Sequence, residues 1–150
     1  MVQVIQVFDS WASHLSPVDF EEFAAPYTKR IISGFKHTHP EVPIILYISG
    51  SGGLLERMTA CEPDCLSIDG SVDLADAIKR CGKEFAYQGN MDPGCLFGSK
   101  DFITQRVQQI VRAASDAGVR HIMNLGHGVL PTTPEENVAH YFEVCRNMQY

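Results

Sequence analysis

Short apolar runs alternate with amphipathic stretches along the whole chain, and this alternation limits the possible folds more than any other feature of the sequence. The runs predict five strands, at residues 2–8, 42–48, 65–68, 85–88 and 121–125. Continuous apolar strands that alternate with helices are typical of a parallel sheet covered by helices, either doubly wound or closed into a barrel. No G-x-G-x-x-G segment follows the first run, which argues against a dinucleotide-binding fold. The sequence therefore predicts an α/β fold.

The stretches between the strands predict helices. The first has Ser16 as its N-cap and Pro17 in its first turn, and its helical spacing of apolar residues continues to Phe35. Pro26 lies inside that stretch, so a kink or an interruption is predicted there. Further helices are predicted at residues 54–59, 73–81 and 100–117, and a last one after a capping box formed by Thr133 and Glu136.

Length and composition predict one domain, residues 1–150, with one hydrophobic core. A formal net charge of −6 argues against a nucleic-acid partner, because binding to phosphates needs a concentrated basic face. No apolar run approaches the ~18 residues that cross a bilayer, so no membrane association is predicted. The five cysteines form no C-x-x-C pair, and the histidines show no metal-binding spacing. The cysteines are therefore predicted to be reduced core residues, without a metal site.

Polar and glycine-rich residues follow most of the predicted strands, at the end where parallel α/β folds bind ligands. They are Asp9 and Ser10, residues 49–53, Asp69, Gln88, Asn90, Asp92, Asn124 and His127. Gly126 and Gly128 flank His127, which should let the backbone approach a ligand while the imidazole projects from the strand end. His127 is therefore the strongest candidate site residue.

Weaker patterns have simpler interpretations. The GSGG segment at residues 50–53 could hold an anion, but a tight turn between strand and helix explains it better. Ser10 and His127 could suggest a nucleophile and its base, yet no G-x-S-x-G segment surrounds Ser10. Asp69 and Asp73 resemble an acid–base pair only by proximity in sequence, and helix capping explains them equally well.

Four segments together resemble uroporphyrinogen decarboxylases: FDSWASHLSP, ILYISGSGGLLERM, YQGNMDPGCLFGS and NLGHGVLPTTPEENVAHYFE. The resemblance implies the last five strand–helix units of a (β/α)8 barrel. It also implies a carboxy-lyase that converts uroporphyrinogen III to coproporphyrinogen III without a metal or organic cofactor. Members are expected to form homodimers. The amino-acid sequences of these segments favour a plastid location, with the cytoplasm as the alternative.

The resemblance also implies roles for three residues. Ser10 and His127 match family residues that contact the substrate, and Phe8 would line the wall of the site. The family's catalytic aspartate and its amino-terminal arginines have no counterpart in this sequence, so no catalytic residue is assigned. The chain alone is accordingly expected to be inactive.

Two positions depart from the family pattern. Gly70 stands where a tryptophan usually follows the aspartate, and Pro63 stands where a glycine is common. A non-catalytic, diverged remnant that binds a partner or a tetrapyrrole is therefore an alternative. The related cobalamin-associated methyltransferases are less favoured, because they need a thiolate zinc site opening with H-x-C, and this sequence has no H-x-C.

Overall fold

The predicted alternation of strands and helices is present in the computed structural model, which describes residues 2–148. Five parallel strands form one sheet in the order β1-β2-β3-β4-β5. The strands are β1 (Ile5–Asp9), β2 (Ile44–Ile48), β3 (Cys65–Ser67), β4 (Ala86–Gln88) and β5 (His121–Ile122). The predicted α/β class with a parallel sheet is confirmed.

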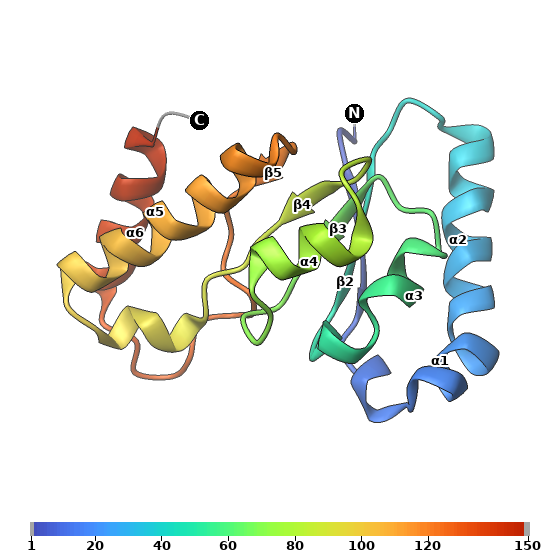
Figure 1. Cartoon of the computed structure of the whole chain (residues 1–150), viewed down its shortest axis with the longest axis horizontal. Helices are drawn as coiled ribbons and strands as arrows, with labels where there is room; N and C mark the ends of the chain where they lie inside the picture. The colour runs from blue at the N-terminus through green and yellow to red at the C-terminus, as the bar shows by residue number, and fades with distance from the viewer. Residues whose placement is uncertain (1, 149–150) are drawn as a thin grey trace.

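Helices follow the strands and cover one face of the sheet (Figure 1). They are α1 (Pro17–Phe23), α2 (Ala25–Thr38), α3 (Leu55–Thr59), α4 (Leu74–Cys81), α5 (Lys100–Ala117) and α6 (Glu135–Asn147). Helices that follow one another in the chain also contact each other: α3 contacts α4, α4 contacts α5, and α5 contacts α6. The helices therefore form a continuous outer layer.

The strand order and the curvature of the sheet are those of part of a barrel. Each strand pairs with the next one along the chain, whereas a doubly wound sheet reverses direction at a switch point. The Gln88 side chain on β4 donates to the Gln6 side chain on β1 at 3.2 Å. Three strand spacings of about 4.8 Å would hold these strands about 14 Å apart in a flat sheet. The sheet therefore curls around its inner face, which is consistent with part of a (β/α)8 barrel.

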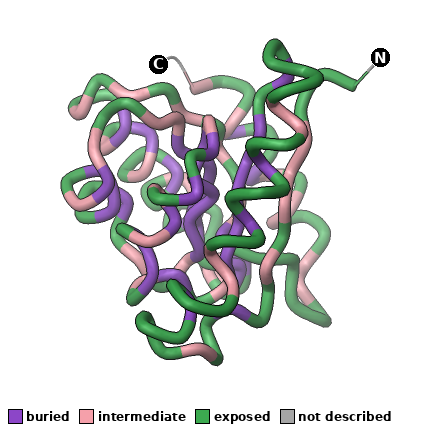
Figure 2. Tube along the Cα trace, turned by 90° about the vertical axis from the view of Figure 1, so that its right-hand side faces the viewer, coloured by how far each residue is buried: buried purple, intermediate pink, exposed green. Residues whose placement is uncertain are grey.

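The outer face of the sheet carries the main hydrophobic core. In the strand register, Val7, Leu46, Leu66 and Tyr87 lie side by side and point toward the helices. Leu46, Leu66 and Tyr87 are completely buried. Figure 2 shows the buried residues concentrated in the strands and on the inward sides of the helices. A smaller cluster, centred on Leu96, joins α5 to α6.

The first helical stretch behaves as its sequence predicts. Ser16 accepts a hydrogen bond from the Asp19 backbone through its side chain, which confirms it as the N-cap of α1. The stretch is interrupted at Ala24, and Pro26 lies in the first turn of α2, where a missing N–H group costs nothing.

Several predicted boundaries are wrong, including the start of the second strand, which is Ile44 and not residue 42. The first strand begins at Ile5 rather than at residue 2, because its pairing starts at Pro43, which has no N–H group to extend the ladder. The last strand ends at Ile122, because β4 has already ended and pairing resumes only at a bridge between Met91 and Leu125. Thr133 does not cap the last helix, because the N-cap position is taken by Pro134, whose side chain cannot accept a hydrogen bond.

Candidate functional site

A cavity of about 280 Å³ lies on the inner face of the curled sheet, at the carboxyl ends of the strands. Phe8, Ser10 and His127, the three residues singled out from the sequence, all line it. Its other lining residues are Gln6, Tyr47, Ser67, Asn124, Leu125, Gly126 and Gly128. Residues that are more than one hundred positions apart in the chain thus share one hollow.

The parallel register brings the strand residues of the cavity together. Phe8 on β1 pairs with Tyr47 on β2, and Tyr47 pairs with Ser67 on β3. Paired residues in a parallel sheet point to the same face, so these three side chains form one row across the inner surface. Ser10 follows β1, and His127 comes from the loop that follows β5.

The aromatic rings of this row meet at their edges. Phe8 and Tyr47 have centroids 5.8 Å apart at an interplanar angle of 63°, and Tyr47 and His127 lie 6.3 Å apart at 64°. Tyr47 therefore stands between the two predicted site residues, in the edge-to-face arrangement that aromatic pairs prefer. Phe8 is nevertheless 67% exposed, so its ring is open to a ligand.

The hydrogen bonding of His127 assigns its tautomer. The Gly128 backbone N–H donates to His127 Nδ1 at 2.7 Å. A ring nitrogen that accepts a hydrogen bond carries no proton, so we assign the proton to Nε2. The imidazole of His127 is exposed and can donate from Nε2 to an acceptor in the cavity.

The two glycines beside His127 differ in their surroundings. A Cβ atom on Gly126 would come within 2.7 Å of the Asp69 carbonyl carbon and the Gly70 Cα atom, whereas one on Gly128 would meet nothing within 4 Å. Gly126 therefore permits a close approach of backbone to backbone. Both glycines line the cavity, and their role in ligand approach stays a prediction.

The GSGG turn binds an internal carboxylate. Asp69 follows β3, is almost completely buried, and accepts hydrogen bonds from the backbone and the side chain of Ser51 and from the backbone of Ser71. Burial alone would raise the pKa of Asp69, but these hydrogen bonds from Ser71 and Ser51 outweigh it and lower the pKa. Asp69 is thus an ionised structural anchor and a poor proton donor.

The remaining polar residues after the strands have structural partners. The Asp73 side chain accepts from the Asp76 backbone as the N-cap of α4, and Asp92 accepts from the Gly94 backbone. The Asn90 amide donates to the carbonyl oxygens of Asp69 and Val72. Capping therefore accounts for Asp73, and the Asp69–Asp73 pair is not arranged for acid–base chemistry.

Sequence reasoning missed three residues of the cavity, Gln6, Tyr47 and Ser67. They lie inside strands, and two of those strands are almost wholly apolar. Such strands are expected to be buried on both faces, so no residue within them was considered as a site residue. Each of the three residues places a polar atom in an apolar run, and this could have identified them. A polar atom in a buried strand is rarely left without a hydrogen-bond partner. Gln6 and Ser67 do share a partner in the Gln88 amide.

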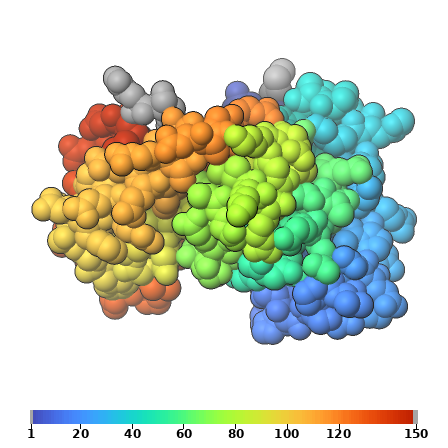
Figure 3. All heavy atoms as spheres, in the orientation of Figure 1, coloured from blue at the N-terminus to red at the C-terminus, as the bar shows by residue number. Residues whose placement is uncertain are grey.

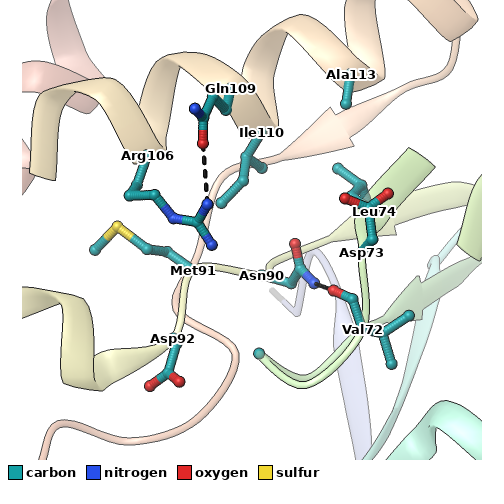
Figure 4. A pocket seen from close by; sticks show the side chains of 11 residues that line it. Val72, Asp73, Leu74, Asn90, Met91, Asp92, Arg106, Gln109, Ile110 and Ala113 are labelled. Atoms are coloured by element: carbon teal, nitrogen blue, oxygen red, sulfur yellow. Dashed lines mark hydrogen bonds between the residues drawn. The ribbon is translucent and has the colours of Figure 1, made fainter. Parts of the chain in front are cut away.

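A second hollow, of about 90 Å³, lies between the start of α4 and the middle of α5 (Figure 4). Figure 4 shows the Arg106 side chain on its α5 side, bonded to Gln109 at 3.0 Å. In Figure 3, α5 and α6 form an amber-to-red lobe that meets the green atoms of α4. None of the three predicted site residues lines this smaller hollow.

Gly70 lies at the rim of this second hollow. A Cβ atom there would approach the Asp92 Cα atom to 2.8 Å, so the backbone of the neighbouring loop occupies the space of a side chain. A tryptophan, which the family resemblance leads us to expect at this position, would not fit this close packing of loops.

The cavity on the inner face carries no Lys, Arg, Asp or Glu among its lining residues. Within residues 2–148, no group of three or more His, Cys, Asp or Glu side chains is arranged to hold a metal ion. Over the same residues, no helix has both the length and the apolar character needed to cross a membrane.

Cys61, Cys65 and Cys81 are buried, and burial raises the pKa of their thiols to about 11, 12 and 11, in agreement with their predicted role in the core.

Comparisons with known proteins point in one direction. A family model described as Uroporphyrinogen decarboxylase (URO-D) matches residues 1–148. Uroporphyrinogen decarboxylase of Hordeum vulgare is 56% identical over 148 residues, which are 99% of this chain and 44% of that protein. Uroporphyrinogen decarboxylase 2, chloroplastic, of Arabidopsis thaliana is 55% identical and 37% covered, and the protein of Nostoc punctiforme is 54% identical and 41% covered. The chain spans about two fifths of the length of these relatives.

Proposed function

This chain belongs to the uroporphyrinogen decarboxylase family, and we propose that it supplies one wall of the substrate site of a uroporphyrinogen decarboxylase. The reaction would be the removal of four acetate carboxyl groups from uroporphyrinogen III, which gives coproporphyrinogen III in tetrapyrrole synthesis. The observation that carries the proposal is the single cavity lined by Phe8, Ser10 and His127.

The three side chains suit a substrate made of pyrrole rings with carboxylate arms. The Ser10 hydroxyl and the Nε2–H group of His127 would donate hydrogen bonds to carboxylate oxygens. The exposed ring of Phe8 would pack on a pyrrole. The cavity of about 280 Å³ is near the lower limit of small-molecule pockets, ~300–1,000 Å³, so it would hold one part of the tetrapyrrole.

In the decarboxylation reaction, the residues of this cavity would need only to bind and orient the substrate. A pyrrole is electron-rich enough to accept a proton at the ring carbon next to the one that bears the acetate arm. The resulting cation accepts the electron pair that is released as CO2 leaves, so the substrate serves as its own electron sink. The methylene carbon left behind then takes up a proton and the ring carbon gives up the one that it gained, which completes a methyl group. Ser10 and His127 would hold the carboxylates in place and exclude alternative orientations. The proton donor and the cationic groups would come from other parts of the protein, since no Lys, Arg, Asp or Glu lines this cavity.

We further propose the assembly and location that the family implies. A homodimer is expected for the complete protein. The relatives in Oryza sativa, Zea mays and Arabidopsis thaliana are named as chloroplastic, which supports a plastid location, and the cytoplasm is the alternative.

A chimera tests the proposal. The segment of the Hordeum vulgare protein that aligns with residues 1–148 is replaced by those residues, and decarboxylation of uroporphyrinogen III is followed by chromatography of the oxidised porphyrins. The chimera should form coproporphyrinogen III. His127→Asn in the chimera should reduce the turnover at least about tenfold, because one charge-assisted hydrogen bond of about 1.5–3 kcal/mol is lost.

The control is Asp73→Asn, which keeps a good N-cap on α4 far from the cavity and should leave the turnover unchanged. A chimera that is folded and dimeric but forms no product would contradict the proposed function. An active chimera that tolerates His127→Asn and Ser10→Ala would contradict the proposed roles.

A further inference from the structure

Tyr47 is the side chain through which β2 contacts the loop that carries His127. Its hydroxyl donates to the Gly126 carbonyl oxygen at 3.0 Å, across the width of β3 and β4. Its ring edge faces Phe8 on one side and His127 on the other. The residue is buried, with 7% of its surface exposed, so its hydrogen bond to Gly126 is shielded from water.

The hydroxyl of Tyr47 is a permanent donor. Burial raises the pKa of Tyr47, an interaction with the Ser49 side chain opposes this, and the negative charge of Asp69 raises it further. The proton therefore stays on the hydroxyl in the physiological range, and the Gly126 carbonyl keeps its partner.

The bond to Gly126 restrains the position of His127, the next residue in the chain. The Gly126 N–H group donates to the Met91 carbonyl at 2.8 Å, so the glycine is held from both of its peptide groups. The Gly128 N–H group then meets His127 Nδ1 and leaves Nε2 as the donor toward the cavity. A shift of the loop would change both the direction of the imidazole and its tautomer.

We propose that Tyr47 is the positioning residue of His127, which it holds in the Nε2–H tautomer with the imidazole directed into the cavity. The inference rests on the proposed role of His127 in binding substrate carboxylates, and it assigns to Tyr47 no contact with the reacting atoms. Tyr47 acts through the loop carbonyl and through its ring edge.

Tyr87 offers a matched control on the opposite face of the same sheet. It is also a buried tyrosine whose hydroxyl donates to a glycine carbonyl, that of Gly82. It lies in the outer core among the helices and does not line the cavity. Tyr87→Phe therefore removes a comparable hydrogen bond without contact to the His127 loop.

The first measurement needs no substrate. Long-range ¹H–¹⁵N correlation spectra of the 150-residue chain report which ring nitrogen of His127 carries the proton. The chain should show the Nε2–H pattern, Tyr47→Phe should show a mixture of both tautomers, and Tyr87→Phe should match the unaltered chain. Unchanged His127 signals in Tyr47→Phe, or an equal change in Tyr87→Phe, would overturn the proposal. Backbone amide spectra of each variant verify that it is folded.

The second measurement is a double-mutant cycle with uroporphyrin, a stable oxidised tetrapyrrole, as the probe. Tyr47→Phe should weaken its binding about fivefold, as expected for one neutral hydrogen bond, and should have no effect in a His127→Asn background. Equal weakening in both backgrounds would overturn the positioning role. This cycle is run in the chimera described above, which supplies the rest of the site. If the unaltered chimera does not bind uroporphyrin, the proposed function of this site fails, and the tautomer spectra still decide the role of Tyr47.

Discussion

The two faces of the sheet are made by the same strands, and helices cover only the outer one. On the outer face, Leu46, Ile48 and Leu66 are completely buried under the helices. On the inner face, the edge-strand residues Phe8 and Ile122 are 67% and 47% exposed, whereas Tyr47, Ser67 and Gln88 in the same row are buried. Because side chains alternate along a strand, each strand contributes to the core with one set of residues and to the cavity with the other.

This separation means that stability and binding can be changed independently. Replacements on the outer face should lower the free energy of unfolding, whereas those on the inner face should alter the cavity and leave the core intact. The following experiments test that division, each by urea unfolding of the 150-residue chain.

Leu46→Ala should give the largest effect, a loss of about 2–5 kcal/mol in the free energy of unfolding, because a buried leucine leaves a cavity behind. Its inner-face counterpart, Ile122→Ala, should lose less than about 1 kcal/mol, because that side chain is already half exposed. Equal losses at the two positions would show that the inner face also contributes a core.

Gly126→Ala should lower the free energy of unfolding by about 1–3 kcal/mol, because the added methyl group meets the backbone of Asp69 and Gly70. Gly128→Ala is the control, with no atom within 4 Å of its Cβ position, and should change it by less than about 0.5 kcal/mol. If both variants behave alike, the close approach of the two loops is not a packing constraint.

Asp69→Asn should destabilise the chain by about 1–3 kcal/mol at neutral pH, since the hydrogen bonds from Ser51 and Ser71 favour the charged carboxylate. The pKa of Asp69 is lowered in the folded state, so its stabilisation is present above the ordinary aspartate range and is lost as the pH falls through the lowered value. The difference between the two proteins should therefore shrink in acid. A pH-independent difference would contradict the ionised anchor.

The smallest effects on stability are expected for the proposed substrate contacts. His127→Asn and Ser10→Ala should each change the free energy of unfolding by less than about 0.5 kcal/mol, because both side chains are exposed. A loss above 1 kcal/mol from either one would mean that the cavity wall itself holds the fold together.

The sequence predicted the fold where local signals and tertiary packing agree. Continuous apolar runs located all five strands, and Ser16 and Pro26 marked a helix start and an interruption that the structure contains. Thr133 shows the limit of such signals, because the last helix begins one residue later than its capping pattern predicts, with Pro134 at the N-cap position.

The candidate site was predictable only in part, for a geometric reason. Strand ends drew attention to Ser10 and His127, because parallel strands present them at one edge of the sheet. Tyr47 and Gln6 lie within strands, and their meeting with distant residues depends on the curl of the sheet, which no local pattern encodes. Curvature is a property of the assembled strands and twist of the sheet, so it appears only when the strands are placed together.

The contact between Gly126 and Gly70 ties the evolution of two loops together. Gly126 cannot acquire a side chain unless the loop of Asp69 and Gly70 withdraws, and Asp69 connects that loop to the GSGG turn. An insertion around residues 69–71 would displace Gly126, and with it the imidazole of His127. Sequence changes in the GSGG turn, in the loop of Asp69 and Gly70 or in the loop of Gly126 are therefore limited by the neighbouring segment, although the three lie far apart in the chain.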